Sequence, residues 1–71
     1  MNSYTVIVSF HNSEGKVLNV KQVFCYCDLE ALDETIETTE SVPPGGCISY
    51  TAFQDGKVAR QNSIPASLFW G

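Results

Sequence analysis

The chain has 71 residues, of which 44% are hydrophobic and 17% are charged, a composition typical of one small globular domain. Its net charge of −4, with only four Lys and Arg residues, argues against bare nucleic acid or a membrane surface as the main partner. No apolar run is long enough to span a membrane and no secretory signal is recognisable, so we expect a cytoplasmic protein. Three cysteines, an odd number, fit a reducing compartment better than a disulfide framework.

The N-terminal part of the chain predicts two strands joined by a turn. Residues 4–10 alternate, which is typical of a half-buried strand. One face would carry Tyr4, Val6, Val8 and Phe10, and the other Thr5, Ile7 and Ser9. Residues 11–15 are turn formers, and Gly15 can adopt the positive φ that closes a hairpin.

The second predicted strand covers residues 16–26. Its apolar face would carry Leu18, Val20, Phe24 and Tyr26, and its other face Asn19, Lys21 and Val23. The alternation is imperfect at Gln22-Val23, which indicates a bulge.

One helix is predicted, from Asp28 as N-cap to about Thr39. A periodicity of 3.6 residues places Leu29, Leu32 and Ile36 on one apolar stripe. Pro43-Pro44 cannot continue a helix and Gly45-Gly46 frees the backbone, so the chain should reverse there.

The rest of the chain predicts a second hairpin and an apolar tail. Residues 47–53 are rich in strand formers, Asp55-Gly56 is typical of a two-residue hairpin turn, and residues 57–61 should form the returning strand. Residues 64–71 are unusually apolar for a terminus. We expect this tail to dock on the sheet, the alternative being an exposed apolar patch for a partner that includes Phe69 and Trp70.

These elements predict a single α+β domain over residues 1–71. It would have two layers, an antiparallel four-stranded sheet in the order ββαββ and one amphipathic helix packed on one face. The opposite face, with Thr5, Ile7, Ser9 and Lys21, should be mixed and could hold part of the tail.

Metal binding and catalysis find little support in the residue pattern. Cys25, Cys27 and Cys47 with His11 could supply zinc ligands, but C-x-C is not the C-x2-C spacing of recognisable zinc sites. Buried cysteine is the preferred interpretation, and we predict no metal and no cofactor. A nucleophilic Cys would need a nearby His and positive charge, whereas the surroundings of Cys27 are acidic, so we do not expect an enzyme.

Residues 28–40 contain six of the eight carboxylates and no Lys or Arg. The helix dipole explains those near the start, but Glu30 with Glu34 and Asp33 with Glu37 are like-charge pairs that each cost a few tenths of a kcal/mol. One interpretation is a solvated face that keeps the protein soluble. The other is a partner-binding face that meets a basic groove. Its candidate residues are Glu30, Asp33, Glu34, Glu37 and Glu40.

The order of a strand hairpin, an acidic helix beginning Leu29-Glu30-Ala31-Leu32, the stop Val42-Pro43-Pro44-Gly45 and a further strand resembles the small T7-type phage inhibitor of bacterial RNA polymerase. The resemblance covers about half of the chain, from the second strand to the third. It implies a strand-strand-helix-strand topology and a protein that binds a much larger enzyme without catalysis.

The resemblance also implies that Glu30, Asp33, Glu34 and Glu37 form an acidic strip. The chain departs from that family in residues 47–53, which are uncharged where the family has arginines. It also adds the Asp55-Gly56 hairpin and the apolar tail. The resemblance therefore implies a kind of protein and not a particular partner.

From these observations we predict a non-enzymatic inhibitor, encoded by a phage or mobile element, that acts in the host cytoplasm. Its acidic helix face would bind a larger host protein or complex with a basic groove, such as RNA polymerase or a CRISPR-type effector. We expect no direct contact with nucleic acid or membrane. The alternative is a small structural domain that self-associates, for example as a homodimer, through its apolar tail or an edge strand.

Overall fold

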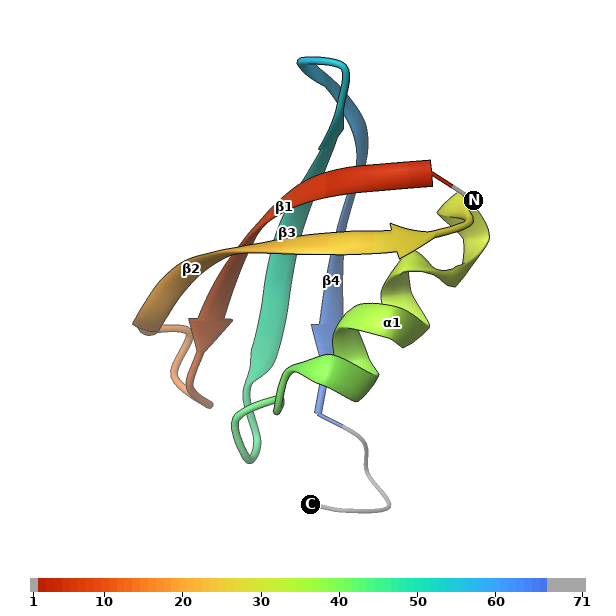
Figure 1. Cartoon of the computed structure of the whole chain (residues 1–71). Coiled ribbons are helices and arrows are strands. Elements are labelled where there is room, and N and C mark those ends of the chain that lie inside the picture. The colour runs from red at the N-terminus through yellow and green to blue at the C-terminus, as the bar shows by residue number, and fades with distance from the viewer. Residues whose placement is uncertain (1, 67–71) are drawn as a thin grey trace.

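A computed structural model describes residues 2–66, which form a four-stranded antiparallel sheet and one short α-helix (Figure 1). The α+β class is therefore confirmed. The strands are β1 (Asn2–His11), β2 (Val17–Cys27), β3 (Cys47–Gln54) and β4 (Lys57–Pro65). Their order in the sheet is β2-β1-β3-β4, so β2 and β4 are the two edges. None of the helices in this part of the chain is long and apolar enough to cross a membrane.

The helical connection differs from the single helix predicted from Asp28. A 3-10 turn, η1 (Leu29–Ala31), comes first, and the α-helix α1 (Leu32–Thr39) follows. Asp28 takes the extended N-cap backbone, but its side chain makes no capping hydrogen bond, and its carbonyl oxygen accepts one from the Ala31 amide at 3.0 Å. The first turn therefore has the i→i+3 hydrogen bond of a 3-10 helix. The predicted end of the helix near Thr39 is confirmed.

The core lies between the helix and one face of the sheet (Figure 1). Leu32 and Ile36 of α1 are completely buried, whereas Leu29, the third member of the predicted stripe, lies in η1 and is 37% exposed. The strand residues buried with them alternate along the chain, as the period of 2 requires. They are Tyr4, Val6 and Val8 of β1, Cys25 and Cys27 of β2, Ile48, Tyr50 and Ala52 of β3, and Ile64 of β4.

No described element covers the other face of the sheet, which we call the open face. The register pairs Val8 with Lys21 and Val6 with Val23, so Lys21 lies on the helix side and not, as predicted, with Thr5, Ile7 and Ser9. The apolar face of β2 consequently points outward, and Phe24 is 78% exposed. No bulge occurs at Gln22-Val23; the irregularity of this hairpin lies between Phe10 and His11.

Two turns show why glycine is needed. Asp55 and Gly56 both have positive φ (53° and 76°), which confirms the predicted two-residue hairpin turn. Gly46 follows the proline stop and lies against β1, where a side-chain carbon would overlap the backbone carbonyl of His11. Only glycine therefore allows this close approach of the connection to the sheet.

The sheet extends further toward the C-terminus than the predicted strand 57–61. Ile64 is 7% exposed and pairs with Ile48, and the Ala66 amide donates to the Gly46 carbonyl oxygen at 3.0 Å. The first residues of the predicted tail thus belong to or follow directly on β4. The remainder, including Phe69 and Trp70, lies outside the described residues.

Candidate protein-binding surface

The five carboxylates predicted to bind a partner all lie on the helical connection, but they point in two directions. Asp33 and Glu40 face the sheet, where each contacts a basic side chain. Glu30, Glu34 and Glu37 are exposed. Asp33 and Glu40 therefore link the helix to the sheet, whereas the other three carboxylates face solvent, although all five lie on one short segment.

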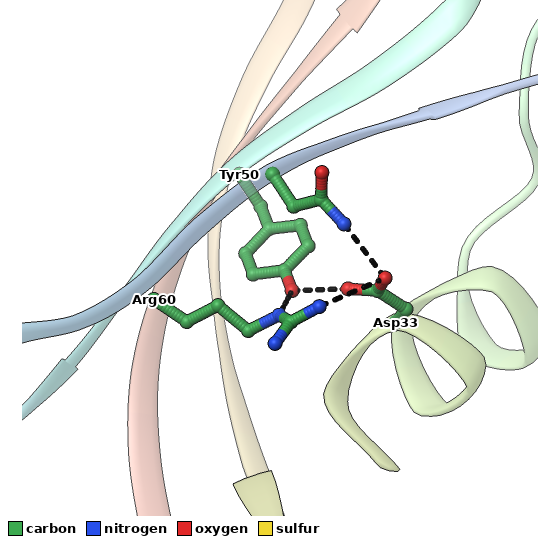
Figure 2. Close-up of polar contacts among 4 residues, drawn as sticks. Asp33, Tyr50 and Arg60 are labelled. Atoms are coloured by element: carbon green, nitrogen blue, oxygen red, sulfur yellow. Dashed lines mark hydrogen bonds and ion pairs between the residues drawn. The ribbon is translucent and has the colours of Figure 1, made fainter. Parts of the chain in front are cut away.

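Asp33 is the centre of a polar cluster that joins α1 to β3 and β4 (Figure 2). The Tyr50 hydroxyl donates to Oδ1 of Asp33, and Nη2 of Arg60 lies 3.4 Å from Oδ2. Arg60 Nε also donates to the Tyr50 hydroxyl oxygen at 3.0 Å. The Asn62 amide completes the cluster by donating to Oδ2 of Asp33 at 2.7 Å. The carboxylate at the start of α1 is thus fastened to two strands at once.

The cluster changes the ionisation of its members. Partial burial disfavours the charged carboxylate, but the hydrogen bonds from Tyr50 and Arg60, the positive charge of Arg60 and the Asn62 amide outweigh it, so the pKa of Asp33 is lowered. Burial, together with its hydrogen bond to the carboxylate, raises the pKa of Tyr50 to about 12. Tyr50 is therefore a protonated donor, and Asp33 an ionised acceptor, throughout the neutral range.

Glu40 makes the second link between the helix and the sheet. It is the C-cap residue directly after α1, its side chain is only 10% exposed, and it forms an ion pair with Lys21 of β2. The Lys21 side chain is 46% exposed, so the pair lies at the edge of the covered face. Glu40, which the helix dipole disfavours at this end, is accounted for by a cation from the sheet.

The three exposed carboxylates form one ridge, which we call the acidic ridge: Glu30, Glu34 and Glu37. Glu34 and Glu37, three residues apart, share one side of α1, and the exposed Glu30 precedes them in η1. Glu34 and Glu37 lie on the side of α1 opposite the buried Leu32 and Ile36. The acidic ridge is thus the outward surface of the helix layer.

The cations of the described chain do not compensate the acidic ridge. Arg60 and Lys21 are engaged with Asp33 and Glu40. Lys16 and Lys57 are exposed and lie at the turns of the two hairpins, where the β1–β2 and β3–β4 connections extend away from α1 (Figure 1). The ridge therefore presents a purely negative surface.

The cysteines do not form a second site. Cys25 and Cys27 are buried free thiols, and Cys47 is half-buried. Burial, the neighbouring Cys27 and the charge of Glu40 together raise the pKa of the Cys25 thiol, which disfavours the reactive thiolate. Residues 2–66 contain no group of three or more His, Cys, Asp and Glu side chains that could hold a metal ion. His11 belongs to β1 and not to the predicted turn.

Comparison of the chain with protein-family models, with curated protein sequences and with solved structures found no match. The case for a function therefore rests on the residues and the geometry of this chain.

The two links that divide the acidic residues, Asp33 with Arg60 and Glu40 with Lys21, were not predicted from the sequence. A signal for the larger one was present, since Arg60 and Asn62 alternate with Ile64 and so share its face of β4. The shorter predicted strand 57–61 hid this relation. For Lys21, the signal was its parity with Cys25 and Cys27, which places all three on one face of β2.

Proposed function

We propose that this chain is a non-enzymatic inhibitor, encoded by a phage or another mobile element, that binds the basic groove of a host machine that handles nucleic acid. RNA polymerase and CRISPR-type effector complexes are the two classes of target, and the host cytoplasm is the place of action. The observation that carries the proposal is the acidic ridge, three exposed carboxylates on the helical segment with no cation of the described chain opposite them.

The charge density of the ridge suits a groove built for nucleic acid. Glu34 and Glu37 are three residues apart in α1, so they lie about 4.5 Å apart along its axis, and Glu30 precedes them in η1. Each strand of DNA presents one phosphate per about 3.4 Å of axis. A groove lined with Lys and Arg would meet a similar linear charge, and long-range attraction would speed the encounter.

The contrast with Asp33 and Glu40 supports a role outside folding. Those two carboxylates have partners on the sheet, whereas Glu34 and Glu37 are neighbouring like charges on α1 and repel each other by a few tenths of a kcal/mol. In a domain this small, stability is marginal. Carboxylates that repel without a partner in the described chain are therefore better explained by an external partner.

The test is a direct binding measurement with purified bacterial RNA polymerase and with a CRISPR-type effector. The triple variant Glu30→Lys/Glu34→Lys/Glu37→Lys should fold as the wild type does, because the three side chains are exposed. We expect it to lose binding and inhibition of the target, by at least ~100-fold in Kd, since several charge pairs are reversed together. Binding of the wild type should also weaken as salt is raised.

Asp33 should be left unchanged in this variant, because its substitution would break the cluster with Tyr50 and Arg60 and confuse folding with binding. Glu14→Lys is the matched control for the single variant Glu34→Lys. Both variants change the net charge equally at an exposed position, but Glu14 lies in the β1–β2 turn and not on the acidic ridge. Glu14→Lys should leave binding almost unchanged. Tight binding by the triple variant at physiological salt would refute the proposal.

A further inference from the structure

The exposed apolar side chains of this protein are concentrated on one edge of the sheet. Of the large hydrophobic residues that are mostly exposed in residues 2–66, all but Leu29 and Val58 belong to β2. They are Val17 (51%), Leu18 (56%), Val20 (53%), Phe24 (78%) and Tyr26 (68%). Scattered single apolar residues are ordinary on a surface, but a contiguous set marks an interaction site.

The same strand presents an unpaired backbone. β2 has 11 residues, and no other described strand pairs with its outer side. About half of its amide and carbonyl groups therefore point outward as donors and acceptors for a further strand.

The two edges of the sheet differ in how they are protected. β4 carries Lys57, Arg60 and Pro65, and charged residues and proline on an edge strand discourage the addition of a further strand. β2 has one charged residue, Lys21, whose side chain points to the helix side and is paired with Glu40. A hollow of about 230 Å³ between β2 and α1, lined in part by Val23 and Thr39, leaves room for side chains of an added strand. β2 is therefore the edge open to pairing.

We propose that β2 pairs with β2 of a second copy of this chain, in antiparallel register about a two-fold axis at Gln22. Gln22 is the midpoint of Val17–Cys27, so this register alone uses the full length of both strands. It places Val20 opposite Phe24 of the second copy and Leu18 opposite Tyr26, each pair being formed twice. Val20, Phe24 and Tyr26 lie on the open face, where aliphatic and aromatic cross-strand pairs stabilise a sheet.

The charges also favour a second copy over a foreign strand. With a net charge of −4, two copies repel each other at most surfaces, yet β2 has no acidic residue, and in this register Lys21 faces Val23 of the second copy. The two-fold axis is normal to the sheet, so both acidic ridges lie on the same side of the dimer. This inference goes beyond the proposed function and does not depend on it.

Sedimentation velocity of the full chain over a range of concentrations tests the proposal. We expect a dimer with a Kd in the micromolar range. Val20→Lys should raise this Kd by at least ~10-fold, because the two-fold axis doubles the effect of each lost pair. Val58→Lys is the matched control, since Val58 is equally exposed and also lies on the open face, but near the far edge. It should leave the Kd within about two-fold of the wild type, a shift small against the pair energies at the interface.

The register has its own test. The double variant Val20→Lys/Phe24→Glu places a lysine opposite a glutamate twice, so it should dimerise more tightly than either single variant. Gln22→Cys should form a disulfide-linked dimer under mild oxidation with oxidised glutathione, because directly opposite residues lie at a Cα distance that a disulfide spans. Gln61→Cys on β4 should cross-link no faster than the wild type.

Several outcomes would overturn the proposal. A wild type that stays monomeric at millimolar concentration excludes the dimer. Equal loss of dimer in Val58→Lys and Val20→Lys would indicate stacking of open faces. Loss in Phe69→Ser/Trp70→Ser without loss in Val20→Lys would assign the interface to the tail. The triple variant of the acidic ridge should dimerise normally, so failure of the inhibitor proposal and failure of this one are distinguishable.

Discussion

The face of the sheet that α1 covers and the open face are made by the same four strands, yet they differ in almost every property. The covered face holds the buried core and the two polar links, Asp33 with Arg60 and Glu40 with Lys21. The open face has no charged residue on the described strands and exposes Phe24 and Tyr26. In β2, therefore, the more apolar side of the strand is the exposed one.

The register explains this outcome for β2. The helix packs on the apolar sides of β1 and β3, whose side chains are buried. Because Tyr4 on that side of β1 pairs with Cys25, the register places the cysteines of β2 in the core. A one-residue slip would exchange the two sides of β2, but it would also move Lys21 away from Glu40. The neighbours of a strand therefore decide which of its faces is buried.

The largest expected effect separates the two faces by stability. Leu32→Ala removes a completely buried side chain and should lower the free energy of unfolding by about 2–5 kcal/mol, because it leaves a cavity in the core. Phe24→Ala removes a larger side chain that is 78% exposed and should change the free energy by no more than about 0.5 kcal/mol. Urea unfolding at low protein concentration measures both. Equal losses would mean that the open face is part of a folded core.

A smaller effect is expected within the helix, between neighbouring carboxylates. Asp33→Asn removes the negative charge that accepts hydrogen bonds from Tyr50, Arg60 and Asn62, and should cost about 0.5–1.5 kcal/mol because solvent screens the partly exposed cluster. Glu34→Gln, one residue further along, should be neutral to within about 0.5 kcal/mol or slightly stabilising. Thermal or urea unfolding of the two variants makes the comparison. If both were neutral, the Asp33 cluster would not fasten the helix to the sheet.

The pH dependence of stability should come from the covered face. The pKa of Asp33 is lowered on folding, so its stabilisation is present above the unfolded pKa near 3.8 and is lost as the pH falls through the lower folded value. The pKa of Tyr50 is raised, so its contribution is present below pH 10 and is lost as the pH rises toward about 12.

Unfolding measured across pH tests both signs. Asp33→Asn should flatten the acid limb and Tyr50→Phe the alkaline limb, each relative to the wild type at the same ionic strength. An alkaline limb that is unchanged in Tyr50→Phe would show that another group is responsible.

Much of the fold could be predicted from the sequence, because local signals dominate it. The alternation of residues 4–10 and 47–53, the Asp55-Gly56 turn and the proline stop each act within a few residues. For the two links from the helix to the sheet, the alternation along β2 and β4 indicates only the face of each basic residue, and not its partner, because each link joins residues far apart in the chain, as with Asp33 and Asn62. In the sequence the five carboxylates are equivalent. In the structure two of them, Asp33 and Glu40, differ from the rest because they contact basic side chains of the sheet.

The smallest expected effect concerns the pair at the rim of the covered face. Lys21→Met should cost up to about 1 kcal/mol, because the lysine is nearly half exposed and solvent screens much of the attraction. Glu40→Gln should cost less, since it leaves an exposed cation, whereas Lys21→Met leaves a carboxylate that is only 10% exposed without its partner. The double variant completes a cycle that isolates the pair. A coupling free energy of zero between Lys21 and Glu40 would show that this ion pair does not stabilise the fold. The Asp33 cluster would then be the one of these two polar links that stabilises the packing of the helix on the sheet.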